Sequence, residues 1–432
     1  MRDRSVRGVR LRVSASAVNH RALQLFGRAI PRLTGGWLPW LTLDRYHRLA
    51  LPGADWVRLR PILSGICGTD LSLLTGRASA VLSPFASFPA VLGHEVVALV
   101  EEAGEGSSAA QGQRVVVDPV ISCFVRGLEP CEACAVGQTR LCRRAAEGSI
   151  SPGMLIGYCR DLPGAWSEEM VAHASQLHAV PDGLSDEVAV LVEPFSVALH
   201  AVLAEPPAEG DRVLVIGAGT MGLCTLGALR LVAPAAEVAV VVRHDTQAAL
   251  AERIGAAHVV RDRRGDGALD AAVSVAGARA YRPLVGPPTL VGGFGQVYDC
   301  VGRGSSLAAS LRVAAPQARV VLVGGPGEIE GLDLTLAWTR ELRVHGTYVY
   351  GREPSLRGMP HTFSLALDLL TQHPELPVGE LVTHRFALAD WRRALATALD
   401  RRGQGALKVT FAGRAASKLA GRAGGGWSPW RP

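Results

Sequence analysis

The chain contains the stretch Arg212-Val213-Leu214-Val215-Ile216-Gly217-Ala218-Gly219-Thr220-Met221-Gly222, in which an apolar run leads directly into a G-x-G-x-x-G motif. The run suits a buried parallel strand, and a helical pattern opens after it. Gly217 permits a tight turn, Gly219 lets the backbone approach a pyrophosphate, and Gly222 lets the helix pack on the strand. Because a helix N-terminus attracts phosphate, this context predicts dinucleotide binding; a purely structural glycine turn is the alternative.

Strand and helix patterns alternate from this motif to about Tyr348. The predicted strands are Val238–Val242, Gln296–Asp299 and Arg319–Val323, and the predicted helices are Met221–Leu231, Thr246–Ile254 and Ser305–Val313. Such alternation predicts an α/β domain built on a doubly wound parallel sheet.

The nature of the dinucleotide depends on the residues about 20 positions after the glycine turn. An acid normally stands there to bind the ribose 2′-hydroxyl of NAD, but this chain has Arg243 and His244, followed by Asp245. Basic residues suit a 2′-phosphate, so the sequence favours NADP over NAD, while Asp245 leaves NAD open. The residues expected to bind the cofactor are Gly217, Gly219, Thr220, Met221, Gly222, Arg243 and His244, with Val301 and Val323 at the ends of later strands on the nicotinamide side.

The N-terminal half has a different pattern. Trp56–Leu63, Val96–Val100 and Arg114–Val117 read as short strands separated by turns, which predicts a β-rich first domain. A helix is expected over Asp186–Leu203, and a last strand over Ala406–Phe411.

Three fragments of this half carry residues that bind zinc in proteins. They are Cys67-Gly68-Thr69-Asp70, Gly93-His94-Glu95 and Glu193-Pro194. Thiolate, imidazole and carboxylate are zinc ligands, and a catalytic zinc keeps one position open for water or substrate. Each fragment is weak alone, since a single histidine before a glutamate is more often an ordinary surface or core residue. Their order ahead of a dinucleotide motif is much more specific.

A second metal signal is a cluster of cysteines. Four of the eight cysteines fall in one short segment: Cys123, Cys131, Cys134 and Cys142. In a chain without an export signal such a cluster indicates a metal site in preference to disulfides, and four thiolates form a closed structural zinc site.

Taken together, these motifs resemble the zinc-containing medium-chain alcohol dehydrogenases, especially the sorbitol and threonine dehydrogenase branches. The matching residues are Gly65-Ile66-Cys67-Gly68-Thr69-Asp70, Gly93-His94-Glu95, Val192-Glu193-Pro194, Ser196-Val197-Ala198, Gly217-Ala218-Gly219 and Leu407-Lys408-Val409, so the likeness spans roughly residues 53–412. It implies a GroES-like β-rich catalytic domain from both parts of the chain, with a Rossmann domain inserted. The expected domains are an N-terminal extension (1–36), the GroES-like domain (37–195 and 347–413), the Rossmann domain (196–346) and a basic C-terminal tail (414–432).

The resemblance also implies roles for single residues. Cys67 and His94 are expected to bind the catalytic zinc, and Glu95 and Glu193 to share the remaining protein position. Thr69 is expected to carry the alcohol proton toward solvent. Asp70 is expected to orient His94, a role that metal-bound histidines usually need filled.

The chain departs from the family pattern in two places. The usual lobe reads C-x₂-C-x₂-C-x₇-C, but its first position here is Leu128, so Cys123 has to reach back to complete the site. A vestigial lobe with free thiols is the alternative. A histidine often follows the relay hydroxyl, whereas Leu71 and Ser72 stand here.

Charge is concentrated at the two ends of the 432-residue chain, whose formal net charge is +6. Basic ends suit nucleic acid or acidic membrane, but no nucleic-acid motif accompanies them, so solvated tails are expected and neither partner is predicted. The sequence shows no signal peptide and no apolar run of transmembrane length, which favours a cytoplasmic protein; an organelle transit peptide is a minor alternative.

The sequence therefore predicts a zinc-dependent oxidoreductase that transfers a hydride between a secondary alcohol, of polyol, sugar or amino-alcohol type, and NAD(P). Two alternatives remain: a zinc-free quinone or enone reductase of the same superfamily, and a non-catalytic NADP-binding protein. A homodimer or homotetramer is expected by resemblance, formed through the Rossmann half.

Overall fold

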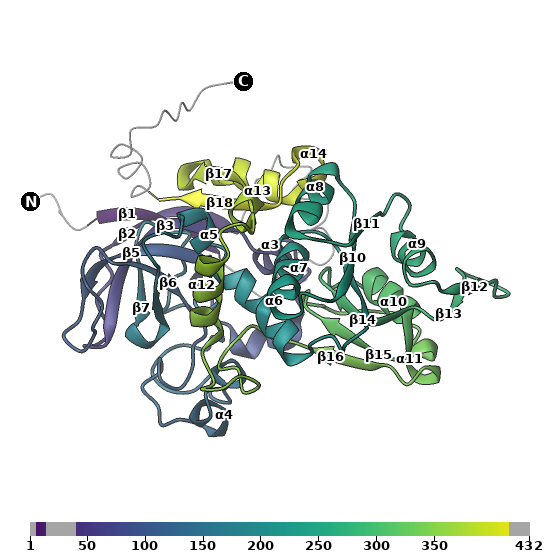
Figure 1. The fold of residues 1–432 in the computed structure, drawn as a ribbon. Helices are drawn as coiled ribbons and strands as arrows, with labels where there is room; N and C mark the ends of the chain where they lie inside the picture. The colour runs from purple at the N-terminus through teal and green to yellow at the C-terminus, as the bar shows by residue number, and fades with distance from the viewer. Residues whose placement is uncertain (1–5, 14–39, 414–432) are drawn as a thin grey trace, which may run out of the picture. The chain divides into compact units, whose positions relative to one another are not determined.

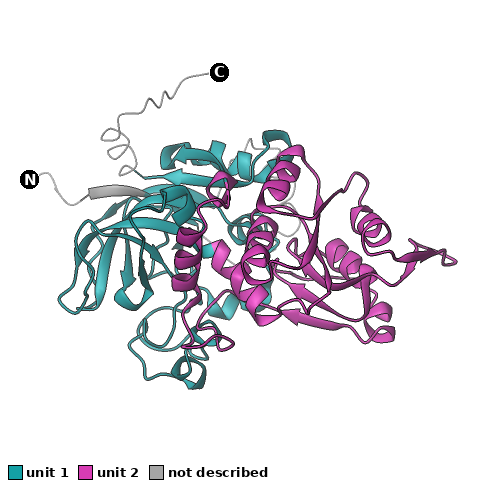
Figure 2. Ribbon diagram, viewed as in Figure 1, with its two compact units in different colours: residues 1–193, 382–432 teal, residues 194–381 magenta. Residues whose placement is uncertain are grey.

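The computed structural model describes residues 6–13 and 40–413. It divides into two compact units (Figure 2): unit 1 comprises residues 1–193 and 382–432, and unit 2 comprises residues 194–381. The predicted tail and most of the predicted N-terminal extension lie outside the described residues. Among the described residues, no helix is both long and apolar enough to cross a membrane.

Unit 1 is built around a seven-stranded sheet with the order β17-β18-β3-β5-β6-β8, in which β7 also pairs with β3. The strands are β3 (Trp56–Gly65), β5 (Val96–Ala103), β6 (Arg114–Val117), β7 (Met170–His173), β8 (Leu177–Ala179), β17 (Val382–Ala387) and β18 (Lys408–Ala412). Strand β18 pairs antiparallel with β3, so the C-terminal segment completes the sheet that the N-terminal half begins.

Unit 1 also contains a three-stranded sheet with the order β2-β1-β4: β1 (Val6–Val13), β2 (Leu41–His47) and β4 (Ala90–Val91). From the sequence, residues 1–36, which include β1, were expected to form an N-terminal extension outside the GroES-like domain. Leu11 and Val13 are nonetheless buried in the core of unit 1, and the Leu11 N–H donates to the carbonyl of Trp166 at 2.8 Å. Residues 6–13 are therefore an integral strand of this unit.

The helices of unit 1 are short: α3 (Gly68–Leu74), η1 (Ala80–Phe85), α4 (Glu132–Ala135), η2 (Thr139–Leu141), η3 (Ala174–Gln176), α5 (Asp186–Ala189), η5 (Leu388–Asp390), α13 (Trp391–Leu399) and α14 (Arg401–Gln404). The single helix expected over Asp186–Leu203 is wrong, because α5 ends and a new helix, α6 (Val192–Ala204), begins. Pro194 has no N–H to donate back to Val190, but it fits the first turn of a helix.

Unit 2 contains a six-stranded sheet whose described pairings are all parallel. Its order is β11-β10-β9-β14-β15-β16. The strands are β9 (Arg212–Ile216), β10 (Glu237–Val242), β11 (His258–Arg261), β14 (Phe294–Asp299), β15 (Ala314–Leu322) and β16 (Arg343–Gly346). Counted along the chain this order is 3-2-1-4-5-6, the doubly wound arrangement, which confirms the predicted fold class.

Helices cover both faces of this sheet (Figure 1), with α7 packed against α8 on one face and α9 against α10 on the other. The remaining elements of unit 2 are α7 (Thr220–Val232), α8 (Asp245–Ile254), α9 (Gly267–Ser274), the hairpin β12 (Arg279–Tyr281) and β13 (Thr289–Val291), α10 (Gly304–Val313), α11 (Thr335–Thr339), α12 (Thr362–Gln372) and η4 (Val378–Leu381). Residues 347–381, assigned from the sequence to the GroES-like domain, group with unit 2.

Candidate metal and cofactor sites

The predicted zinc ligands of unit 1 come from two adjacent strands. Cys67 follows β3 at the start of α3, and His94 and Glu95 immediately precede β5. Their ligand atoms all lie within 4.8 Å of one another, and His94 and Glu95 are only 4% and 1% exposed. Gly65 makes room for this cluster, because a Cβ atom there would lie 1.8 Å from Oε2 of Glu95.

Glu95 also forms an ion pair with Lys408, a residue that the sequence motifs did not assign to the site. Lys408, on β18, is buried, and its Nζ lies 2.6 Å from both carboxylate oxygens of Glu95. Burial alone would lower the pKa of Lys408, but Glu95 and Cys67 together outweigh burial and raise it, so the pair is ionic. The only sequence signal was a lysine inside the apolar segment Ala406–Phe411.

Asp70 contacts both Cys67 and His94 and is completely buried. Its Oδ2 accepts the backbone N–H of Cys67 at 3.0 Å, and its Oδ1 lies 3.5 Å from Nδ1 of His94. Burial disfavours the charged imidazole, yet Asp70 and Cys67 outweigh it and raise the pKa of His94. A partly exposed thiol beside a buried imidazole and a buried carboxylate, which together favour an added positive charge, fits a bound zinc ion.

The other two residues predicted for this site have different positions. Thr69 is exposed in the first turn of α3, two residues beyond Cys67. Glu193 is buried in the first turn of α6, but among the described residues the group within 4.8 Å contains Cys67, His94 and Glu95 without Glu193.

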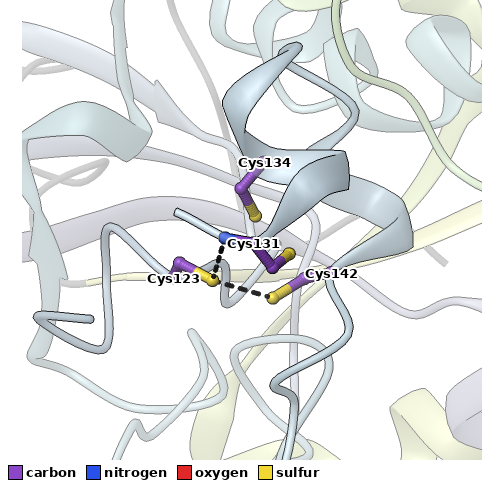
Figure 3. A group of neighbouring side chains, drawn as sticks. All are labelled: Cys123, Cys131, Cys134 and Cys142. Carbon is purple, nitrogen blue, oxygen red and sulfur yellow. Dashed lines mark hydrogen bonds between the residues drawn. The ribbon is translucent and has the colours of Figure 1, made fainter. Parts of the chain in front are cut away.

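The four clustered cysteines converge in one loop region of unit 1, and in Figure 3 their side chains point toward a common centre. All four sulfur atoms lie within 4.8 Å of one another. The Sγ atoms of Cys123 and Cys142 are 3.6 Å apart, and Cys123 accepts the N–H of Cys131 at 3.4 Å. Four thiols at this spacing fit a closed zinc site.

A tight turn brings Cys123 into this group. The N–H of Leu128 donates to the carbonyl of Cys123 at 2.9 Å, and Gly127 adopts a φ of +64°, which favours glycine. The buried Arg126 guanidinium fixes the turn, because it donates to carbonyl oxygens of Ala145, Glu147, Ile150, Ser151 and Gly153. The irregular cysteine spacing is thus accommodated by a loop with its own anchor.

The thiols of this loop differ in acidity. Burial opposes ionisation of Cys131, but hydrogen bonds from the backbone of Arg143 and Cys134 outweigh it and lower its pKa to about 6. Burial raises the pKa values of Cys134 and Cys142. Without a metal, Cys134 and Cys142 are therefore neutral thiols near neutral pH.

The glycine turn of unit 2 has the geometry that dinucleotide binding requires. Gly217 adopts a φ of +92°, and a Cβ there would lie 2.4 Å from Cγ2 of Val301. A Cβ on Gly222 would lie 1.7 Å from the carbonyl oxygen of Gly217, so the close packing of α7 on the turn depends on glycine. Thr220 and Met221 form the first turn of α7, and Val323 follows the neighbouring strand β15.

Basic residues stand at the carboxyl ends of β10 and β11. Arg243 is 64% exposed and pairs with Asp262 at 2.9 Å, while Arg261 pairs with Asp245 at 2.6 Å. His244 is the N-cap residue of α8, and its N–H donates to the side chain of Gln247. Guanidinium and carboxylate groups therefore stand together where the ribose is expected.

The fold and these sites define a zinc-binding oxidoreductase that uses a nicotinamide dinucleotide. The family model of the alcohol dehydrogenase GroES-like domain matches residues 53–182, and that of the zinc-binding dehydrogenase matches residues 220–372. The chain belongs to the zinc-dependent medium-chain alcohol dehydrogenase family.

Two curated relatives are similar over most of their length. The starvation-sensing protein RspB of Escherichia coli (strain K12) is 30% identical over 344 residues, which cover 79% of this chain and 87% of that protein. The L-idonate 5-dehydrogenase of Vitis vinifera is 28% identical over 379 residues, which cover 87% and 93%.

Two solved structures are similar over most of this chain. A putative zinc-binding dehydrogenase from Sinorhizobium meliloti 1021, bound to NADP, has a TM-score of 0.68 and 25% identity, covering 93% of this chain and 99% of its own. An alcohol dehydrogenase (rspB) from E. coli CFT073, complexed with NADH, has a TM-score of 0.66 and 26% identity, covering 86% and 96%.

Proposed function

We propose that this chain oxidises a secondary alcohol, or reduces the matching carbonyl compound, by hydride transfer to or from NAD(P), with NADP preferred. The observation that carries the proposal is the convergence of the partly exposed Cys67 with the buried His94 and Glu95 within 4.8 Å. Relatives with no catalytic zinc do not need such a donor set, so it argues against a zinc-free quinone or enone reductase.

Cys67, His94 and Glu95 would hold the catalytic zinc. When bound, zinc supplies a Lewis acid that makes an alcohol hydroxyl easier to deprotonate, and the nicotinamide accepts the hydride. Thr69 is exposed next to the ligands and would take the hydroxyl proton. Lys408 balances the charge of Glu95, and Glu193, which lies outside the group within 4.8 Å, stays the alternative carboxylate ligand.

The four cysteines Cys123, Cys131, Cys134 and Cys142 would hold a second, structural zinc. Their four sulfur atoms leave no open position for substrate, which is the property that separates structural from catalytic zinc sites.

The preference for NADP rests on Arg243 and its neighbours. An exposed guanidinium binds a phosphate bidentately, and Arg243 stands at the strand end where the ribose is held. Asp262 and Asp245 already pair with the two arginines, so a 2′-phosphate would compete with these carboxylates.

The substrate class is inferred from relatives. Those named for L-idonate, sorbitol and L-threonine each point to a compound with a secondary alcohol beside further polar groups. We therefore propose a polyol, sugar or amino-alcohol substrate.

A homodimer or homotetramer is the proposed assembly. In unit 2, strand β16 lies at the edge of the sheet and all four of its residues are exposed. Leu284 in the β12–β13 hairpin and Trp338 on α11 are 104% and 81% exposed. Edge strands and exposed apolar side chains favour association with another chain. The cytoplasmic location expected from the sequence stays a prediction.

The test is turnover by the purified, zinc-loaded protein. L-idonate, sorbitol, L-threonine and simple secondary alcohols would be offered with NADP and with NAD, and quinones and enones with the reduced coenzymes. Oxidation of at least one alcohol, abolished by chelation and restored by zinc, supports the proposal. Reduction of quinones or enones that survives chelation would favour the zinc-free reductase, and coenzyme binding without any turnover would favour a non-catalytic protein.

A further inference from the structure

Arg261 stands beside the expected position of the coenzyme ribose, although the sequence motifs point only to Arg243 and His244. It is the last residue of β11, the strand that pairs in parallel with β10 (Figure 1). In the register of this pair, Arg261 lies opposite Val242, the residue directly before Arg243. The two arginines therefore belong to the carboxyl ends of neighbouring strands, at the edge of a doubly wound sheet where ligands bind.

Each of the two arginines is paired with an aspartate. Arg243 donates through Nε to Oδ2 of Asp262 at 2.9 Å, and its Nη2 lies 2.9 Å from the same oxygen. Nη1 of Arg261 lies 2.6 Å from Oδ1 of Asp245, the first residue of α8. Because a guanidinium carries five N–H donors in a fork, each arginine can hold its aspartate and still offer donors to a phosphate.

Asp262 is held rigidly by the backbone. Its side chain is only 9% exposed, and its Oδ1 accepts the N–H groups of Gly265 and Gly267 at 2.6 and 3.4 Å. Burial opposes the charged form, but the hydrogen bonds from Arg243 and from these two N–H groups outweigh it and lower the pKa of Asp262. Asp262 is therefore a charged anchor that fixes the Arg243 guanidinium at the strand end.

Asp245 has a different environment. Its side chain is 93% exposed and is paired with Arg261, whose side chain is 40% exposed. An exposed ion pair of this kind is weak, so it can rearrange around a ligand at little cost. A carboxylate that stands soon after the second strand accepts the ribose 2′-hydroxyl of NAD, and its charge repels the 2′-phosphate of NADP. Without Arg261, Asp245 would therefore favour NAD.

We infer that Arg261 is a second specificity-determining residue of the coenzyme site, which binds the 2′-phosphate of NADP together with Arg243 and at the same time neutralises Asp245. The inference rests on the proposed function, since it assumes a nicotinamide dinucleotide at the glycine turn and a preference for NADP.

The consequence is that the two arginines affect the coenzymes differently. Removal of Arg261 takes a donor from the phosphate of NADP and frees a carboxylate for the ribose of NAD, so the two affinities change in opposite directions. Removal of Arg243 weakens NADP alone, because Asp262 stays bound to the backbone of Gly265 and Gly267.

The experiment measures coenzyme binding directly, by the fluorescence of NADPH and NADH in titrations with the purified protein, so it needs no turnover. Arg261→Gln is expected to raise the Kd for NADPH about tenfold or more, the effect of losing a charge-assisted hydrogen bond. It is expected to lower the Kd for NADH about fivefold, the net effect of one added hydrogen bond. Asp245→Ala in the Arg261→Gln background should remove this gain for NADH.

Arg212→Gln is the matched control. Arg212 is also an exposed arginine at the end of a strand, and it pairs with the carboxylate of Glu237 at 3.4 Å. It lies at the amino end of β9, however, which is the opposite end of the sheet from the expected coenzyme site. Both Kd values should therefore stay as in the wild type.

Three results would overturn the inference: an unchanged Kd for NADPH or for NADH in Arg261→Gln, an equal loss of affinity for both coenzymes, or a gain for NADH that survives Asp245→Ala. A wild type that binds neither coenzyme would instead refute the proposed function, and one that binds NADH more tightly than NADPH would refute its NADP preference.

Discussion

At Glu95, one carboxylate faces two cations: the buried ammonium of Lys408, observed at 2.6 Å, and the zinc that the neighbouring thiol and imidazole would hold. Sequence could not decide whether Glu95 or Glu193 completes the ligand set. The energetic consequence of removing Lys408 differs between the two cases, which makes the question measurable.

Lys408→Met should destabilise the metal-free protein strongly, by about 3–5 kcal/mol, because it leaves the buried Glu95 charge without a partner. With zinc bound the loss should be clearly smaller, since the metal also balances Glu95. Urea denaturation of apo and zinc-loaded protein measures both values, and Lys408→Arg is the charge-conserving control. Equal losses in the two forms would mean that Glu95 is not a ligand.

Arg243 is a residue that we expect to select NADP over NAD. Arg243→Ala should lower kcat/KM for NADPH about 10- to 100-fold, the effect of losing a charge-assisted hydrogen bond, and leave kcat/KM for NADH nearly unchanged. Steady-state kinetics with both coenzymes measure the ratio. Arg253→Ala, at an exposed arginine later in α8 that pairs with Glu380, is the matched control. A parallel fall for both coenzymes would contradict the NADP preference.

Among the structural elements, those predicted correctly are the ones whose pattern is local. The β9–glycine turn–α7 unit and the strands β3, β5, β6 and β10 show apolar runs or alternation that a short window contains. Strand β16 could not be predicted, because all four of its residues are exposed and it therefore has no apolar pattern. Strand β1 was hidden by its arginines and by its pairing with residues 41–47, far along the chain.

The same distinction applies to the candidate zinc site. Cys67, His94 and Glu95 were named because they belong to short motifs, whereas Lys408 reaches the site from β18, near the other end of the chain. Contacts between residues that are far apart in the chain form only in the folded protein, so they do not appear as a motif of fixed spacing in the sequence. Cys123 is an intermediate example. The cysteine itself could be assigned to the cluster from the sequence, but the turn that brings it there could not be predicted.

The cysteine lobe predicts a definite pH dependence. In a Cys67→Ala background, where only the lobe should bind zinc, binding at about pH 7.5 should release the protons of Cys134 and Cys142, because their raised pKa values keep them protonated without metal. Affinity should therefore fall as the pH falls. Cys131, with a pKa of about 6, should contribute only at more acidic pH.

Zinc titration in a weakly buffered solution with a pH indicator measures this release, and Cys159→Ser, at a buried cysteine outside the lobe, is the control. Binding without proton release, or affinity independent of pH, would contradict the assignment of these thiols as ligands.

At the scale of the whole molecule, the exposed edge of unit 2 predicts an oligomer. The wild type should be a dimer or tetramer by light scattering. Val344→Lys, which places a charge in the middle of the edge strand β16, should shift it toward smaller species without changing its folding. Val273→Lys, at an exposed valine on α9, is the control. A monomeric wild type at micromolar concentration would contradict the proposed assembly.

The central claim, that one zinc in this chain does the chemistry and another holds a loop, is tested most directly by metal content. Wild-type protein and a Cys67→Ala variant would be purified in parallel, and zinc per chain and alcohol oxidation with NADP measured on the same samples. Two zinc ions per wild-type chain are expected. The variant should keep one, with its fold intact and its activity lost. A single zinc that the substitution leaves in place, or full activity in the variant, would contradict it.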